Sequence, residues 1–70
     1  MNIRKALENY PDMLQMKHLE HILGLKASTL YIWLRQGRIR GFKLGQEWRV
    51  AKEELITYLE DCQNRTPQHG

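Results

Sequence analysis

The sequence predicts a small, mainly α-helical domain that carries one short β-hairpin. Three observations lead to this fold class. Apolar residues recur at helical spacing in three segments, glycines stand where the first two of these segments end, and residues 42–50 alternate around Gly45. The predicted order is helix, short turn, helix, hairpin, helix. A chain of 70 residues leaves room for one core at most, so we expect a single domain.

The two ends of the chain are predicted to be peripheral. Residues 1–13 form an N-terminal extension in which Asn2 can begin a short helix. Pro11 ends that helix, because the residue before a proline disfavours the α conformation. Residues 14–61 form the domain. Residues 62–70 lack apolar periodicity and are expected to be a flexible tail.

The first two helices of the domain are separated by only a few residues. The first carries an apolar face, and Gly24 after it permits a tight turn or a left-handed C-cap. Rotation of about 100° per residue then divides the second helix into two sides. The side predicted to be buried carries Leu30, Trp33 and Leu34. The outer side carries residues that suit a DNA groove, namely Ser28, Tyr31, Ile32 and Arg35. The alternative is an ordinary helical hairpin with a polar outer face.

The β-hairpin is expected to close through a three-residue loop of residues 45–47, with Gly45 supplying the unusual backbone angles. Lys43 then faces Arg49, and both share the outer face of the hairpin. The other face is apolar and packs on the helices through Phe42, Leu44, Trp48 and Val50. Two like charges opposite one another repel slightly, whereas a phosphate backbone beside them makes the contact attractive. The alternative is that the two cations protect the strands from aggregation.

The last helix follows the hairpin directly. Leu55, Tyr58 and Leu59 define its apolar face. Glu53 and Glu54 lie in its first turn, where the helix dipole favours negative charge.

These elements together resemble a known family. The segment from about Leu14 to Glu60 is similar to the excisionase-type, MerR-like winged helix-turn-helix DNA-binding domain. The resemblance rests on a Leu-Gly step, a Ser-Thr-x-Tyr helix, a basic-x-Gly-basic step, a Phe-Lys-x-Gly-x-x-Trp-Arg wing and a Leu-x-x-Tyr-Leu helix. The matching residues are Leu23, Gly24, Ser28, Thr29, Tyr31, Arg35, Gly37, Arg38, Phe42, Lys43, Gly45, Trp48, Arg49, Leu55, Tyr58 and Leu59.

The resemblance implies a winged helix-turn-helix fold in which residues 27–36 enter the major groove of DNA. The wing would contact phosphate or the adjacent minor groove. Lys26 departs from the family pattern, which usually has a Ser or Thr helix cap at this position. The cap is expected to be weaker here as a result.

Composition is compatible with this function. Lys and Arg outnumber Asp and Glu by 11 to 8, a moderate basic excess that also occurs in small domains without a nucleic-acid partner. The single cysteine excludes an internal disulfide and favours a reducing compartment. No apolar run reaches the roughly 18 residues of a membrane span, and the N-terminal residues lack a signal-peptide core. We therefore expect a cytoplasmic protein with no membrane partner.

The predicted function is sequence-specific binding of double-stranded DNA by a small excisionase-like factor of phage or mobile-element type, acting in DNA recombination or transcription regulation. The predicted DNA contacts are Ser28, Thr29, Tyr31, Ile32, Arg35, Arg38, Arg40, Lys43, Gln46 and Arg49. Possible protein partners are further copies of the chain side by side on DNA, and an integrase or other DNA-processing protein. One alternative is a protein-interaction adaptor on a winged scaffold without DNA binding. Another is a DNA-binding head for phage DNA packaging.

No catalytic, cofactor or metal site is predicted, and we expect no enzymatic activity. The sequence contains no phosphate-cradling glycine loop, triad or paired carboxylates. His18 and His21 have a spacing that can hold zinc, but no other His or Cys stands nearby, which favours a solvated pair. Cys62 is interpreted as a bystander thiol. Trp33 and Trp48 are expected in the core, because a domain this small needs its large aromatic residues there.

Overall fold

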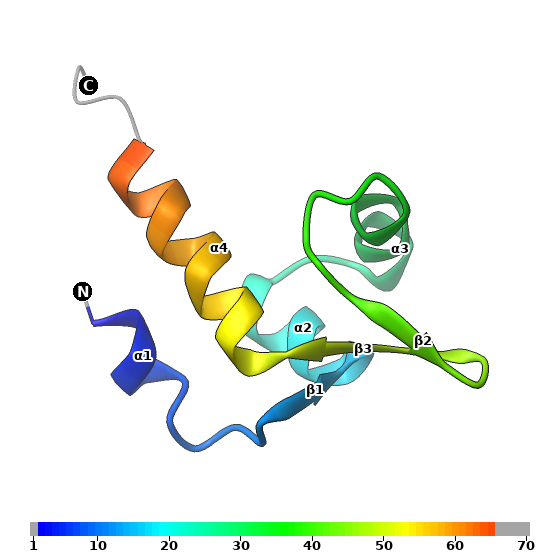
Figure 1. Ribbon diagram of the computed structural model, residues 1–70, viewed down its shortest axis with the longest axis horizontal. Helices are drawn as coiled ribbons and strands as arrows, with labels where there is room; N and C mark the ends of the chain where they lie inside the picture. Colours follow the sequence, from blue (N-terminus) through cyan, green and yellow to red (C-terminus); the bar gives the residue numbers. More distant parts are fainter. Residues whose placement is uncertain (1, 66–70) are drawn as a thin grey trace.

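The computed structural model describes residues 2–65 and arranges them as a mainly helical domain with a small antiparallel sheet (Figure 1). This architecture is consistent with the predicted winged helix-turn-helix. The elements in chain order are α1 (Ile3–Ala6), β1 (Met13–Gln15), α2 (Met16–Leu23), α3 (Ala27–Arg35), β2 (Phe42–Leu44), β3 (Glu47–Ala51) and α4 (Lys52–Arg65).

Strand β1 is an addition to the predicted hairpin. It pairs antiparallel with β3, placing Leu14 opposite Val50, so the sheet order is β1-β3-β2 and β3 is the central strand. No linker separates the sheet from two of the helices, because Gln15 is followed at once by Met16 of α2 and Ala51 by Lys52 of α4. The sheet therefore joins the helix pair to the last helix.

The helix pair has the short connection that the sequence predicts. Residues 24–26 link α2 to α3, a turn of the length found in helix-turn-helix motifs. Gly24 adopts the left-handed conformation with φ of 68°, and its N–H donates to the carbonyl of Glu20 at 2.8 Å. Of the two possibilities predicted for Gly24, the structure shows the left-handed C-cap.

Helix α1 begins as predicted, with Asn2 as its N-cap. The Asn2 side-chain oxygen accepts a hydrogen bond from the backbone N–H of Lys5 at 3.0 Å. Ile3 and Leu7 are buried, so residues of the predicted N-terminal extension contribute to the core. Arg4 donates two hydrogen bonds, of 2.7 and 3.0 Å, to the carboxylate of Glu53 and so ties α1 to α4. This hydrogen bonding lowers the pKa of Glu53 below its ordinary value.

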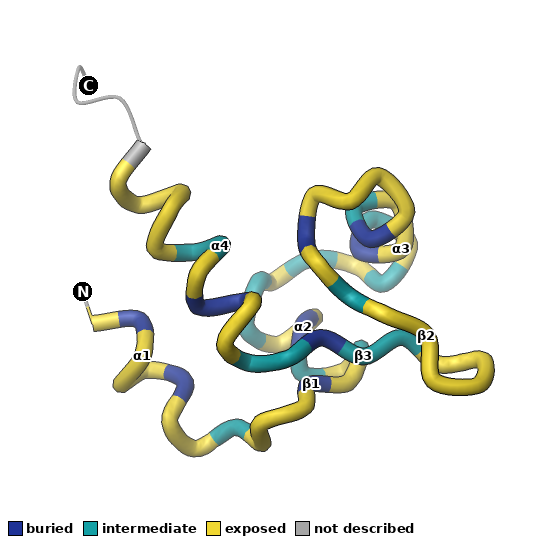
Figure 2. Tube along the Cα trace, in the orientation of Figure 1, coloured by how far each residue is buried: buried dark blue, intermediate teal, exposed yellow. Residues whose placement is uncertain are grey.

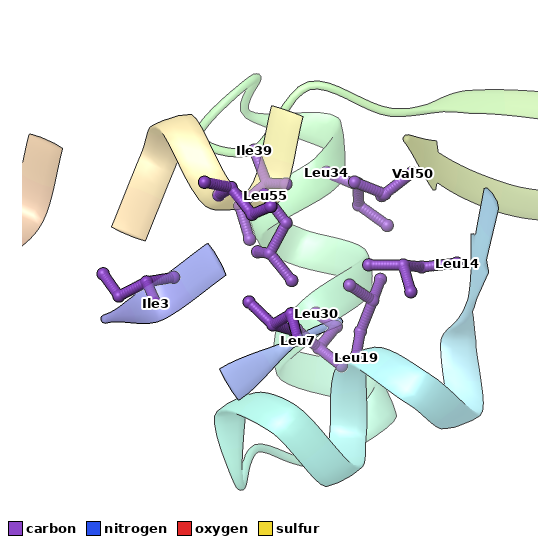
Figure 3. Close-up of a cluster of buried hydrophobic side chains, with 10 residues drawn as sticks. Ile3, Leu7, Leu14, Leu19, Leu30, Leu34, Ile39, Val50 and Leu55 are labelled. Carbon is purple, nitrogen blue, oxygen red and sulfur yellow. The ribbon is translucent and has the colours of Figure 1, made fainter. Parts of the chain in front are cut away.

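The core forms where the helices meet one face of the sheet (Figure 3). Leu14 and Val50 come from the sheet and lie close to Leu19 of α2 and Leu34 of α3. We call the sheet face that carries Leu14 and Val50 the inner face. Within residues 2–65, the core consists of Ile3, Leu7, Leu14, Leu19, Leu30, Leu34, Ile39, Val50, Leu55 and Ile56. Trp33 and Trp48 are only partly buried and pack around this cluster instead of within it.

Helix α4 is longer than the sequence suggests. Residues 62–65, which were predicted to belong to the tail, are helical. The remainder of the predicted tail, residues 66–70, lies outside the described residues.

Candidate nucleic-acid interface

Helix α3 has the two sides that its sequence predicts. Leu30 and Leu34 are buried against the core, while the opposite side is exposed (Figure 2). The exposed residues are Ser28, Tyr31, Ile32 and Arg35. Tyr31 and Ile32 keep 40% and 46% of their surface accessible. Thr29, a further predicted contact, is half-buried. The outer side of α3 thus combines a hydroxyl, apolar surface and a guanidinium.

The start of α3 lacks a side-chain cap. Lys26 occupies the N-cap position in an extended conformation, and among the described residues its side chain makes no capping hydrogen bond. Ser, Thr, Asp and Asn are preferred at this position because their side chains accept a hydrogen bond from the first turn. The departure of Lys26 from the family pattern therefore has the structural consequence expected.

The loop of the hairpin is one residue shorter than the sequence predicts. The observed pairs are Phe42 with Arg49, Lys43 with Trp48 and Leu44 with Glu47, so the loop is the two residues Gly45 and Gln46. Gly45 has φ of 70°, and among residues 2–65 only glycines have positive φ. Glycine at the first central position is the requirement of a type II′ turn, whose twist matches that of the flanking strands. The expected three-residue loop is wrong for this reason.

A register change of one residue moves every side chain of one strand to the other face relative to its partner strand. Lys43 lies opposite Trp48 and therefore on the inner face, the side of the sheet on which α3 packs. Arg49 lies opposite Phe42 on the other side, which we call the outer sheet face. The prediction that Lys43 and Arg49 share one cationic face is wrong, as is the prediction of a uniformly apolar opposite face.

The two cations of the wing have different surroundings. The Lys43 ammonium lies 5.9 Å from the centre of the Trp48 ring, and Lys43 is exposed. Arg49 instead forms a salt bridge of 2.9 Å with Glu47 and donates a hydrogen bond of 3.2 Å to the backbone carbonyl of Trp48. Only 20% of the Arg49 side chain is exposed. Lys43 is consequently the wing cation that is available to a partner on the α3 side.

The two arginines between α3 and β2, Arg38 and Arg40, have different neighbours. The Arg38 guanidinium lies 4.7 Å from the centre of the Trp33 ring, and the ring of Tyr58 of α4 lies 6.3 Å from the Trp33 ring, centre to centre. Burial raises the pKa of Tyr58, with a hydrogen bond to Cys62 adding to the effect and the charge of Arg38 opposing it. Arg40 lines a hollow of about 230 Å³ together with Gly41, Phe42, Ala51 and Glu54. Arg38 and Arg40 are exposed, as is Arg35.

Gly41 sets the position of the wing relative to α3. A Cβ atom at Gly41 would lie 2.7 Å from Cδ2 of Leu34 and 3.1 Å from the carbonyl oxygen of Arg49. The absence of a side chain at this position therefore lets the chain pass between α3 and β3. Gln46, the remaining predicted contact, is exposed at the tip of the wing.

The histidines of α2 take part in local contacts. Nδ1 of His18 accepts a hydrogen bond of 2.9 Å from the backbone N–H of Gln15, and Nδ1 of His21 is hydrogen-bonded to the hydroxyl of Tyr10. These contacts join the N-terminal segment to α2, so the description as a solvated pair is incomplete. Residues 2–65 contain no group of three or more His, Cys, Asp or Glu that could hold a metal ion.

Comparison with known proteins identifies the fold. Residues 13–63 match the family model described as a helix-turn-helix domain. The chain belongs to the helix-turn-helix domain family. The match begins at the first residue of β1 and includes both helices of the pair, the wing and most of α4. No curated protein and no solved structure gave a significant match.

Membership of this helix-turn-helix family indicates double-stranded DNA binding, and the family is typically non-enzymatic. None of the helices in the described part of the chain has both the length and the apolar character required to cross a bilayer. Sequence reasoning did not find the outer sheet face, because the faces of β2 and β3 depend on the length of the turn between them.

Proposed function

We propose that this protein binds double-stranded DNA in a sequence-specific manner, with the outer side of α3 in the major groove. The observation that carries the proposal is the exposed outer side of α3 in a helix-turn-helix domain, with Lys43 on the same side of the sheet as that helix. Ser28 can bond a phosphate or a base edge, Ile32 can meet a thymine methyl group, and Arg35 can reach guanine or phosphate.

The wing would position the domain on the duplex. Lys43 provides the main phosphate contact, and exposed Gln46 at the tip adds a neutral hydrogen-bonding group. Arg49 contributes little in this proposal, because its charge is balanced by Glu47 and it lies on the outer sheet face. Arg38 and Arg40 add to the general attraction of a chain whose net charge is +3.

In biological terms, we propose an excisionase-like architectural or regulatory factor that acts in recombination or transcription. The resemblance of the motif residues to that family supports this role. An architectural role would bend the DNA, so the distance between dyes at the two ends of a bound duplex should shorten in a fluorescence-transfer experiment. An unchanged distance on a high-affinity site would argue for a purely regulatory role.

The test of DNA binding starts with selection of bound sequences from a random pool, followed by titrations of the selected site at several salt concentrations. The logarithm of affinity should fall linearly with the logarithm of salt, with a slope of about −0.9 for each phosphate contact. Lys43→Ala should weaken selected and random DNA alike and reduce the slope by about one unit. Arg49→Ala is the matched control and should leave the slope unchanged, because Glu47 already neutralises Arg49.

Three results would contradict parts of this proposal. Affinity without a preferred sequence would contradict specific binding. A slope that Arg49→Ala reduces and Lys43→Ala leaves unchanged would contradict the roles given to the wing cations. Absence of salt-dependent DNA affinity would favour the second candidate, a protein-interaction adaptor. The exposed apolar residues Phe42 and Leu44 on the outer sheet face are the observation that supports that candidate.

A further inference from the structure

The outer sheet face carries exposed apolar side chains that do not belong to the core of the monomer. The register places Met13, Phe42, Leu44 and Ala51 on this face, together with the polar residues Gln15, Glu47 and Arg49. Met13 and Phe42 each keep 44% of their surface exposed, and Leu44 keeps 63%. Trp48 and Val50 point to the inner face, so the apolar residues of the outer sheet face are additional to those that hold the fold together.

Charge on the outer sheet face disfavours DNA as its partner. Glu47 lies directly opposite Leu44, and it forms the ion pair with Arg49 on the same face. A phosphate backbone that approached this face would therefore be repelled by the carboxylate of Glu47, and it would gain little from Arg49, whose charge Glu47 already neutralises. The face is also directed away from the inner side of the sheet, on which α2 and α3 pack. A duplex bound at α3 would leave the outer sheet face available to a protein.

The outer sheet face carries both a projection and a recess. Leu44 projects from it near the wing tip, and the hollow of about 230 Å³ between Phe42, Ala51 and the first turn of α4 opens beside it. A two-fold interface brings the same patch of two subunits together, so it requires a projection and a recess on one surface.

The charges on and beside the outer sheet face are balanced. Among the described residues, those on the face and around the hollow include two cations and two carboxylates, Arg40, Arg49, Glu47 and Glu54. The sum is zero, whereas the chain as a whole carries +3. Two copies can consequently meet at this face without the repulsion that their net charge produces elsewhere.

We propose that two copies of this chain pair through their outer sheet faces in a two-fold arrangement when they are bound to DNA. The proposal rests on the DNA-binding function proposed above and adds the partner that acts with it. Leu44 of each copy lies against the hollow of the other, and Glu47 of each lies near the cations of the other.

The size of the face explains why DNA is needed. Three strands about 4.8 Å apart and up to five residues long, at about 3.4 Å per residue, give a footprint on the order of 240 Å². A stable interface buries about 800 Å² on each partner. The pairing is therefore weak between free molecules, and it becomes significant when a duplex holds two copies next to each other.

The symmetry predicts how the two binding sites are arranged. A two-fold axis between the outer sheet faces relates the two α3 helices, so the half-sites must be inverted repeats. Stacked sheets lie about 10 Å apart, and each α3 packs on the far side of its own sheet. Cooperative binding should consequently occur with inverted half-sites at one preferred spacing and should be lost with direct repeats.

The experiment compares single-site and two-site duplexes built from the selected sequence. Wild-type protein should bind the inverted two-site duplex about tenfold more tightly per site than the single site, the effect of a few partly buried apolar side chains. Met13 lies on β1, away from the wing. Met13→Gln should therefore abolish the gain in affinity on the two-site duplex while leaving single-site affinity unchanged. Leu44→Gln should have the same effect on the gain. Ile32→Gln is the matched control, because Ile32 is exposed to a similar extent on α3. It should weaken single-site binding and preserve the gain.

A second readout does not depend on DNA. Backbone amide shifts of Met13, Phe42 and Leu44 should move as the free protein is concentrated from micromolar to millimolar, and Met13→Gln should suppress the movement. The pairing is overturned if cooperativity survives both Gln variants, if direct repeats are preferred, or if other surfaces show the concentration-dependent shifts. Failure of single-site binding with shifts retained at these residues would overturn the DNA function alone.

Discussion

Replacing Gly41 by Ala tests the junction that positions the wing against α3. The added Cβ would stand 2.7 Å from Cδ2 of Leu34, and 3.1 Å from both the Arg49 carbonyl oxygen and Cγ2 of Val50. Ordinary contacts between such atoms begin near 3.4 Å. The Leu34 methyl must therefore move by most of an ångström, while the backbone of β3 must move by a few tenths. Leu34 and Val50 are both buried, so neither can move freely into solvent.

Overpacking of this kind costs about 1–3 kcal/mol. A domain of 70 residues has a total stability of roughly 4–10 kcal/mol, so the loss is a substantial fraction. Unfolding in urea followed by circular dichroism should give this decrease, and the melting temperature should fall by about 4–8 °C per kcal/mol. Gly45→Ala serves as a comparison. No atom lies within 4 Å of its added Cβ, and any loss there, about 1–2 kcal/mol, reflects the positive φ alone.

A double-mutant cycle identifies the cause of the loss. Leu34→Ala alone should destabilise the protein by about 2–5 kcal/mol, because it leaves a cavity. In the Gly41→Ala background the new methyl group partly fills that cavity. The double variant should therefore lose less unfolding free energy than the two single variants lose in sum, by at least about 0.5 kcal/mol. Strict additivity, or a Gly41→Ala protein as stable as wild type, would refute the close approach of Gly41 to Leu34 of α3.

Two further predictions concern the helix ends. Lys26→Asn should raise the free energy of unfolding by about 1 kcal/mol, measured in urea, because asparagine can cap α3 where Lys26 cannot; a neutral or negative change would contradict the assigned cap. For Glu53, whose folded pKa is lowered by Arg4, the stabilisation is present above the unfolded pKa and is lost as the pH falls through the folded pKa. Wild type should therefore lose more stability than Arg4→Gln between about pH 6 and pH 3. The difference should be small, because the pair is exposed, and an equal loss in both proteins would show that the pair contributes nothing.

The helices were predictable from the sequence because each depends on local spacing. The division of α3 into a side with Leu30 and Leu34 and a side with Tyr31 and Ile32 follows from helical rotation alone, and the structure confirms it. The cap of α1 at Asn2 and the left-handed end of α2 at Gly24 also depend on one or two residues.

The sheet was less predictable because its arrangement depends on distant or alternative pairings. β1 has only three residues, and Leu14 of this strand pairs with Val50, which lies 36 positions later in the chain. No local sequence pattern therefore predicts the strand. The turn at Gly45 is compatible with two or three loop residues, and these choices assign opposite faces to Lys43 and Arg49. The part of the candidate site on α3 was accordingly found from sequence, whereas the part on the wing required the structure.

The direct passage from β3 into α4 has a mechanical consequence. At the junction the N–H of Lys52 donates to the carbonyl of Asp12 at 2.8 Å, and its ammonium group donates to the carbonyl of Tyr10 at 2.9 Å. The junction between the wing and the last helix is therefore tied to the segment that precedes β1. Because Leu55 and Ile56 of α4 are also buried in the core, the base of the wing and the first turns of α4 are held together as one unit.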